Sequence, residues 1–195
     1  MKIMKCGVDV MPKQEEKARM IFGHQMRFDL KNGFPIIPER DLVSAKSGRT
    51  SFFFKALGEL IGFLHGARTV LDLEQFGNNW WGRWASIEKC HKRGLAPGDL
   101  GPGSYGSAWR TFPTDEGKPF DQITHLVEQI KEIPNLRTHF VSPWVPQYVG
   151  RGEGKVQKVV VVPCHGWVHA MVNLEKKTLS IHHFQRSADV PVGLP

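Results

Sequence analysis

"GWVHAMVNLEKKTLSIHHFQ" (residues 166–185) is the stretch that decides the fold class of this chain. Two runs of β-branched, aromatic and aliphatic residues, 166–174 and 178–185, flank the polar link "EKK". Two such runs separated by a short polar link are typical of a β-hairpin. The sequence therefore predicts a pair of antiparallel strands here.

Helical patterns dominate the residues before this hairpin. Residues 50–64 are strongly apolar and are soon followed by Gly66, which indicates a buried helix that ends there. Residues 69–76 continue in helical style. Residues 121–133 carry apolar side chains at helical spacing, with Asp121 as the predicted N-cap and Pro134 just beyond.

Shorter signals complete this outline. Residues 20–30 have strand character, residues 138–144 and 158–163 are further predicted strands, and residues 78–106 are predicted to form a long loop rich in Gly and Pro. Helices followed by consecutive strands predict an α+β fold, in which helices cover a mainly antiparallel sheet. We expect a single domain over residues 1–195.

Composition and charge limit the classes of partner. A hydrophobic content of 41% and a charged content of 23% are those of an ordinary globular protein, and 26 Lys and Arg against 19 Asp and Glu give a net charge of +7. The basic residues are scattered and form no nucleic-acid-binding motif, so a phosphate-bearing small molecule is favoured over nucleic acid. The three cysteines lie far apart. With no readable signal peptide and no apolar stretch long enough for a membrane span, we expect a cytoplasmic protein without disulfides.

"VVPCHGW" (residues 161–167) contains a lone cysteine, Cys164, that has three possible roles. A buried packing residue, a metal ligand and a nucleophile are the alternatives. Four histidines lie near it, at positions 165, 169, 182 and 183, but they lack zinc-type spacing, and we interpret them as solvent-facing strand residues. No metal is therefore expected. Arg186 follows one hairpin later and could stabilise a thiolate, so packing and nucleophilic roles both stay open at this point.

Other candidate residues also have two interpretations. Glu59 lies in the apolar segment "FFFKALGELIGFL", either on an exposed stripe or buried with a raised pKa suited to proton transfer. The tryptophans at positions 80, 81 and 84 are either core residues or a stacking surface for a flat ligand. "GDLGPGSYG" (residues 98–106) is only a weak phosphate-loop signal because it lacks the Gly-Lys-Ser/Thr ending.

Eight segments, taken in order, resemble the thymidylate synthase family from about residue 19 to the end of the chain. They are "IFGHQMRFDLKNGFP", "GELIGFLHG", "WGRWA", "GDLGP…YG…WR", "DQI", "VSPW", "PCH" and "QRSADVPVGLP". The resemblance implies one-carbon transfer from 5,10-methylenetetrahydrofolate to C5 of a pyrimidine nucleoside 5′-monophosphate. It makes Cys164 the nucleophile that adds to C6, Glu59 the organiser of proton transfer and Tyr105 the tyrosine near C5.

The same resemblance implies the binding residues and a homodimer, because Arg137 would reach the phosphate bound by the partner. It assigns the nucleotide to Arg186, Ser187, Gln185, Arg137 and Lys13, and the folate to Asp189, Trp81, Trp84 and Gly193.

Several positions depart from the family pattern. Thr138 stands where a second arginine is usual, "GPGSYG" has one extra residue before Tyr105, and Gly82 and Arg83 replace an acidic pair. The asparagine that reads the pyrimidine edge would fall two positions after Pro195, so we expect a chain shortened at its C-terminus. These departures leave a pyrimidine nucleotide 5-hydroxymethylase and an inactive nucleotide-binding fragment as alternatives to methylation of dUMP.

Overall fold

The computed structural model describes residues 2–12, 17–36, 41–44 and 51–189. The chain forms two compact units, Met1–Ile37 and Pro38–Pro195, and the single domain expected over the whole chain stays a prediction.

In the first unit, helix α1 (Lys2–Cys6) precedes the antiparallel strands β1 (Val8–Val10) and β2 (Ala18–Met20). The strand expected over residues 20–30 is wrong beyond Met20. Gly23 adopts a φ of +76°, which an extended strand does not allow, and the segment closes in the 3₁₀ helix η1 (Leu30–Asn32).

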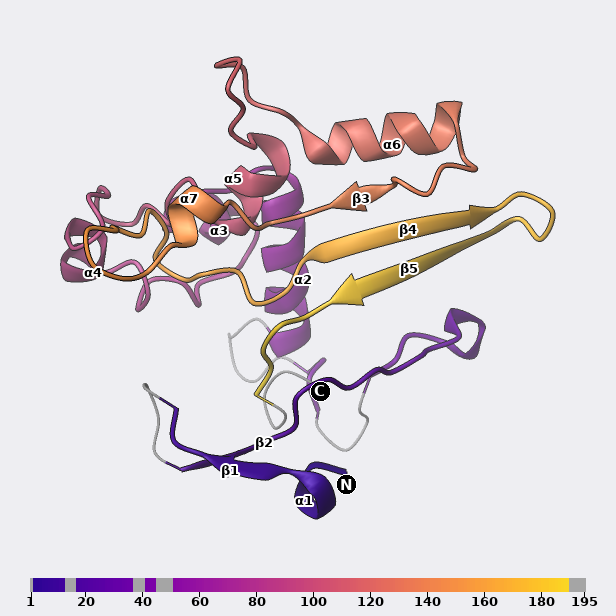
Figure 1. Cartoon of the computed structure of the whole chain (residues 1–195), viewed down its shortest axis with the longest axis horizontal. Coiled ribbons are helices and arrows are strands. Elements are labelled where there is room, and N and C mark those ends of the chain that lie inside the picture. Colours follow the sequence, from indigo (N-terminus) through magenta and orange to yellow (C-terminus); the bar gives the residue numbers. More distant parts are fainter. Residues whose placement is uncertain (1, 13–16, 37–40, 45–50, 190–195) are drawn as a thin grey trace. The chain divides into compact units, whose positions relative to one another are not determined.

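The sheet of the second unit has the strand order β3 (Phe140–Val141), β4 (Trp167–Asn173) and β5 (Thr178–Phe184), all paired antiparallel (Figure 1). The predicted hairpin is confirmed, with its first pair between Trp167 and Phe184. At its turn, the Lys176 backbone N–H donates to Asn173 Oδ1 at 2.8 Å. β4 is the central strand and pairs with both β3 and β5.

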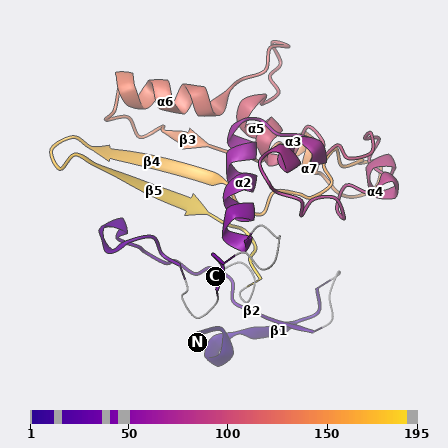
Figure 2. The same ribbon diagram turned by 180° about the vertical axis from the view of Figure 1, so that it is seen from behind.

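The helices of the second unit are α2 (Phe52–Leu64), α3 (Val70–Gln75), α4 (Ile87–His91), α5 (Tyr105–Arg110), α6 (Gln122–Glu132) and α7 (Pro146–Val149). Helices α3, α4, α5 and α7 gather at the end of the sheet where β4 begins and β5 ends, opposite the hairpin turn, and α6 runs beside β3 (Figures 1 and 2). The α+β fold with an antiparallel sheet is confirmed. None of the helices in the described part of the chain combines the length and hydropathy needed to cross a membrane.

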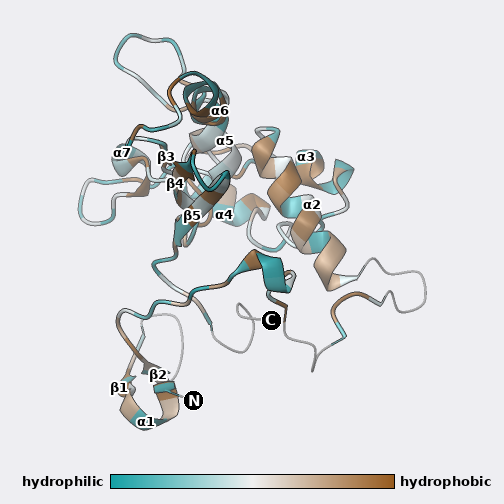
Figure 3. Ribbon diagram, turned by 90° about the vertical axis from the view of Figure 1, so that its right-hand side faces the viewer, coloured by the Kyte–Doolittle hydropathy of each residue, from teal (hydrophilic) through white to brown (hydrophobic). Residues whose placement is uncertain are grey.

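Local sequence explains the two longest helices. Ser51 caps α2 by accepting from the Phe54 N–H at 3.3 Å, and Asp121 caps α6 by accepting from the Thr124 N–H at 3.0 Å. The predicted helices at 50–64 and 121–133 are therefore confirmed to within two residues. Many residues within α2 and α3 are hydrophobic (Figure 3). Of these, Phe63 of α2 and Leu73 of α3 are buried in the core.

Two further sequence predictions, both in the second unit, are wrong. Residues 158–163 form no strand: their backbone instead bonds to the loop at residues 100–103, through Val160 N–H to Leu100 O at 3.0 Å and Gly103 N–H to Lys158 O at 3.2 Å. Residues 78–106 are not one loop, because they contain α4 and the first two residues of α5. For residues 158–163, tertiary contacts decided the local structure.

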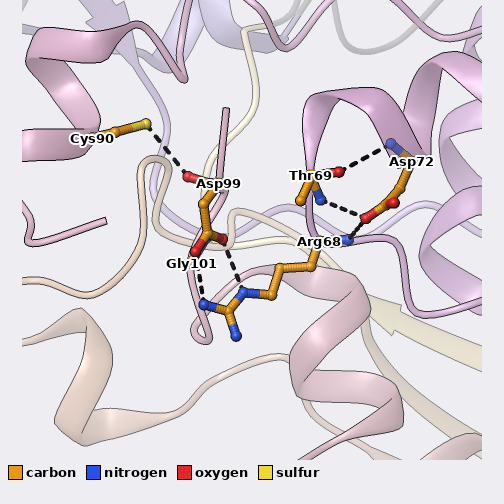
Figure 4. Close-up of polar contacts among 6 residues, drawn as sticks. All are labelled: Arg68, Thr69, Asp72, Cys90, Asp99 and Gly101. Atoms are coloured by element: carbon orange, nitrogen blue, oxygen red, sulfur yellow. Dashed lines mark hydrogen bonds and ion pairs between the residues drawn. The ribbon is translucent and has the colours of Figure 1, made fainter. Parts of the chain in front are cut away.

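An ion pair anchors the loop that leads into α5 (Figure 4). Arg68 binds both carboxylate oxygens of Asp99, with Nε–Oδ1 at 2.9 Å and Nη2–Oδ2 at 2.7 Å. Asp99 Oδ1 also accepts from the Gly101 N–H at 2.8 Å, and Thr69 forms a capping box with Asp72 at the start of α3. These bonds fix where α5 begins, and its first residue is Tyr105.

Candidate active site

Cys164 lies in the short segment before β4, half-buried, and two predicted partners contact it. Its backbone N–H donates to the Tyr105 hydroxyl oxygen at 2.7 Å. Its Sγ lies 3.3 Å from Nη2 of Arg186. The sulfur therefore sits beside a permanent cation, which stabilises negative charge on it.

The Arg186 guanidinium is held by backbone carbonyls. Nε donates to Pro163 O at 2.7 Å and Nη2 to Val162 O at 3.0 Å, while the Arg186 backbone N–H donates to Cys164 O at 2.8 Å. Its Cζ lies 6.0 Å from the centroid of the Trp144 ring. These contacts fix the plane of the Arg186 guanidinium, so its Nη2 approaches the Cys164 sulfur from one direction. A lysine ammonium could not make the same set of hydrogen bonds.

Tyr105 is buried between two rings. It stacks on Phe63 with centroids 4.9 Å apart and on His165 with centroids 4.5 Å apart. Burial raises the pKa of the Tyr105 hydroxyl, so the group stays neutral at physiological pH. A neutral hydroxyl that accepts from Cys164 can still donate its own proton.

Glu59 points from α2 toward the loop that carries the tryptophans. Its Oε2 accepts from Trp81 Nε1 at 2.6 Å and from Asn78 Nδ2 at 3.2 Å. Burial raises the pKa of Glu59, and these two hydrogen bonds oppose the shift. The Trp81 ring meets Tyr105 edge-on at 6.3 Å between centroids, which links Glu59 to the surroundings of Cys164.

The family model for thymidylate synthase matches residues 1–195. This chain belongs to the thymidylate synthase family. The resemblance seen in the sequence is thus confirmed, and with it the general class: a transferase of nucleotide biosynthesis that uses methylenetetrahydrofolate as one-carbon donor.

This thymidylate synthase family chain brings together Cys164, Tyr105 and Arg186 by direct hydrogen bonds, and Glu59 through Trp81. Trp81 itself is buried. Of the two interpretations of Glu59, the structure favours the buried one.

For the remaining predicted site residues, no side-chain contact with Cys164, Tyr105 or Glu59 is seen in the described part of the chain. Gln185 Nε2 donates to Ser187 O at 3.1 Å, next to Arg186, and Arg137 is exposed in the segment before β3. Asp189 is also exposed, while Lys13 and Gly193 lie outside the described residues.

Trp84 is about 42% exposed and carries two cations over its ring. Arg83 Cζ lies 5.1 Å and Lys89 Nζ 4.9 Å from the ring centroid. Trp84 therefore combines a partly exposed aromatic ring with positive charge beside it.

Sequence reasoning missed Asn78, Trp144 and His183. Asn78 carried no motif, although an amide so close to an apolar helix was a usable signal. Trp144 lies in the quoted landmark "VSPW" without an assigned role. His183 is more than a solvent-facing residue, because its Nε2 accepts from the Gly166 N–H at 2.9 Å, just after Cys164. Among the described residues, no group of three or more His, Cys, Asp or Glu is placed to hold a metal ion.

The His165 ring should make this chain less stable in acid. Burial and the nearby His183 lower the pKa of His165 from 6.5 to about 4. As the pH falls through that window, the unfolded state binds a proton that the folded state does not, so the free energy of unfolding decreases. Because of this one group, the free energy of unfolding should be about 3 kcal/mol larger at neutral pH than at a pH below the folded-state pKa of His165.

Replacing His165 by Phe keeps a ring against Tyr105 and removes the titration. We expect a flatter pH dependence of the free energy of unfolding in His165→Phe, measured by urea denaturation at neutral pH and at about pH 4.5, close to the lower end of the range from 6.5 to about 4 over which the folded and unfolded states differ in protonation. His125→Phe, at an exposed position on α6, is the matched control. An equal pH dependence in His165→Phe and the unchanged chain would contradict the assignment.

Proposed function

We propose that the chain transfers one carbon from 5,10-methylenetetrahydrofolate to C5 of dUMP, giving dTMP, through a covalent adduct at C6. The observation that carries this proposal is the Cys164 sulfur 3.3 Å from Arg186 Nη2, with the Tyr105 hydroxyl on the Cys164 backbone N–H. A thiol beside a fixed guanidinium is suited to act as a nucleophile.

Cys164 is the proposed nucleophile. Its sulfur forms a bond to C6 of the pyrimidine, and the electron pair of the C5–C6 double bond shifts toward C5 and the adjacent carbonyl. C5 thereby becomes nucleophilic and forms the new bond to carbon. After the C5 proton has been lost, the C5–C6 double bond re-forms as the C6–S bond breaks, which restores the thiolate. The adduct replaces one difficult substitution by easier steps.

Tyr105 and Glu59 are the proposed groups for proton movement. The Tyr105 hydroxyl stays protonated because burial raises its pKa, and it lies against the nucleophile. The pKa of Glu59 is also raised by burial, which brings its titration closer to physiological pH. Glu59 can therefore take up and return a proton during turnover.

The folate is proposed to bind beside Trp81 and Trp84, with Asp189 and Gly193 as further contacts. The half-exposed ring of Trp84, flanked by Arg83 and Lys89, fits a flat aromatic molecule that ends in carboxylates. When bound, methylenetetrahydrofolate supplies the one-carbon unit and, in the methylating reaction, the hydride that reduces it.

The nucleotide phosphate is proposed to bind Arg186, Ser187 and Gln185, which adjoin one another at the end of β5, together with Lys13. Arg137 is proposed to come from the partner subunit of a homodimer. The exposed position of Arg137 and the net charge of +7 support an anionic ligand. A cytoplasmic location is expected of an enzyme that uses these metabolites.

Hydroxymethylation is the second candidate, and one feature favours it. Gly82 replaces an acidic residue of the family pattern between the two tryptophans, and a Cβ added there would meet no described atom within 4 Å. Gly82 is exposed to solvent, so without the acidic side chain water could approach Trp81 and complete hydroxymethylation in place of hydride.

Product analysis distinguishes these functions. The full chain is incubated with methylenetetrahydrofolate and dUMP, dCMP or CMP in oxygen-labelled water, and the nucleotides are analysed by mass spectrometry. We expect dTMP from dUMP without label, together with dihydrofolate. A labelled hydroxymethyl product would instead identify a hydroxymethylase, and absence of product from all three nucleotides would leave a nucleotide-binding protein. Cys164→Ser provides the background control.

A further inference from the structure

Asn78 is a buried amide whose orientation is dictated by its neighbours. It lies in the loop after α3 and is 1% exposed. Its Oδ1 accepts from the Trp80 N–H at 3.0 Å, and its Nδ2 donates to Lys55 O at 3.0 Å. Reversing the amide would set oxygen against oxygen and nitrogen against N–H, so the amide group has one permitted orientation.

That orientation presents an N–H to Glu59. Asn78 Nδ2 lies 3.2 Å from Glu59 Oε2, and Trp81 Nε1 lies 2.6 Å from the same oxygen. No hydrogen bond from a described residue reaches the other oxygen, Oε1. The two carboxylate oxygens are therefore unequal: Oε2 has two donors and Oε1 has none.

We infer that Asn78 is a positioning residue that, together with Trp81, holds Oε2 of Glu59 as an acceptor and leaves Oε1 as the atom that gains and loses the proton. A protonated carboxyl has one O–H oxygen and one carbonyl oxygen, and only the carbonyl oxygen accepts two N–H bonds without opposing the O–H. The proton therefore resides on Oε1. This inference rests on the proposed role of Glu59 in proton transfer.

The surroundings allow the contribution of Asn78 to be measured. The groups packed against Glu59 are the neutral Asn78 and Trp81 and the Tyr105 hydroxyl, whose raised pKa keeps it neutral; Lys55 lies one turn earlier on α2. Burial raises the pKa of Glu59, and the Asn78 bond lowers it. Removing that N–H should therefore raise the pKa further.

The principal test uses Asn78→Asp. The new carboxylate can keep an oxygen on the Trp80 N–H, but it takes the donor away from Glu59 and brings a like charge near it. We expect the pKa of Glu59 to rise by about 1 unit or more, measured by carbon NMR titration of the full chain with carboxyl-labelled glutamate. Glu59→Gln assigns the signal. Asn79→Asp is the matched control, because it introduces the same charge at the adjacent, exposed position.

A second readout is the pH profile of turnover. Asn78→Asp should lower kcat on the order of 10-fold or more, shift the pH profile with the Glu59 pKa, and leave KM for the nucleotide nearly unchanged. If Asn78→Asp does not fold, Asn78→Ala is titrated in its place, and a rise in the pKa of Glu59 is again expected. An unchanged pKa in the folded variant overturns the inference. The NMR titration needs no substrate. Absence of turnover in the unchanged chain would therefore refute the proposed function but not the inference about Asn78.

Discussion

Cys164→Ser is expected to abolish covalent capture of 5-fluoro-dUMP in the presence of methylenetetrahydrofolate. The serine oxygen can keep the contact with Arg186, so the geometry around position 164 is retained. A hydroxyl without a dedicated base is a far poorer nucleophile than a thiolate, and we expect turnover to fall by at least about 10³-fold. Intact-mass spectrometry of the chain after incubation measures the adduct.

Cys6→Ser is the matched control, because Cys6 is exposed on α1 and should form no adduct of its own. We expect it to behave as the unchanged chain does. Adduct formation that persists in Cys164→Ser would refute the nucleophile assignment. Loss of the adduct in Cys6→Ser would refute it as well.

Replacing Arg186 by alanine should weaken nucleotide binding by about 2–4 kcal/mol, the scale for losing one partner of a desolvated charge pair. The guanidinium also supplies hydrogen bonds to Val162 O and Pro163 O, and carbonyls left without donors cost about 1–3 kcal/mol each where they are buried. Both nucleotide affinity and stability should therefore fall. Calorimetry with dUMP and thermal unfolding measure the two effects separately.

Arg186→Lys distinguishes charge from geometry. Lysine restores the positive charge but cannot bind two carbonyls and a sulfur in one plane, so we expect it to recover only part of the loss. Arg151→Ala removes an exposed arginine from the segment after α7 and is the control for net charge. Equal dUMP affinity in Arg186→Ala and Arg151→Ala would contradict the phosphate assignment.

Local sequence was sufficient where one segment contains its own signals. The hairpin of β4 and β5 carries its two strands and its turn within residues 166–185, and α6 carries its cap and its apolar spacing. Residues 158–163 show the limit of such reasoning. Their valines suit a strand, but backbone hydrogen bonds to residues 100–103 hold them outside the sheet.

The site divides in the same way. The sequence alone determined the family, the fold class and the candidate residues, since these depend on the order and identity of motifs along the chain. Only the tertiary structure decided that Arg186 reaches the Cys164 sulfur, that Glu59 is buried, and that Asn78 and Trp81 bind the same one of its oxygens. These contacts join residues 19 to 59 positions apart along the chain, such as the hydrogen bond from Cys164 to Tyr105. Burial and hydrogen-bond geometry between such distant residues arise when the elements pack, and no periodicity within one segment encodes them.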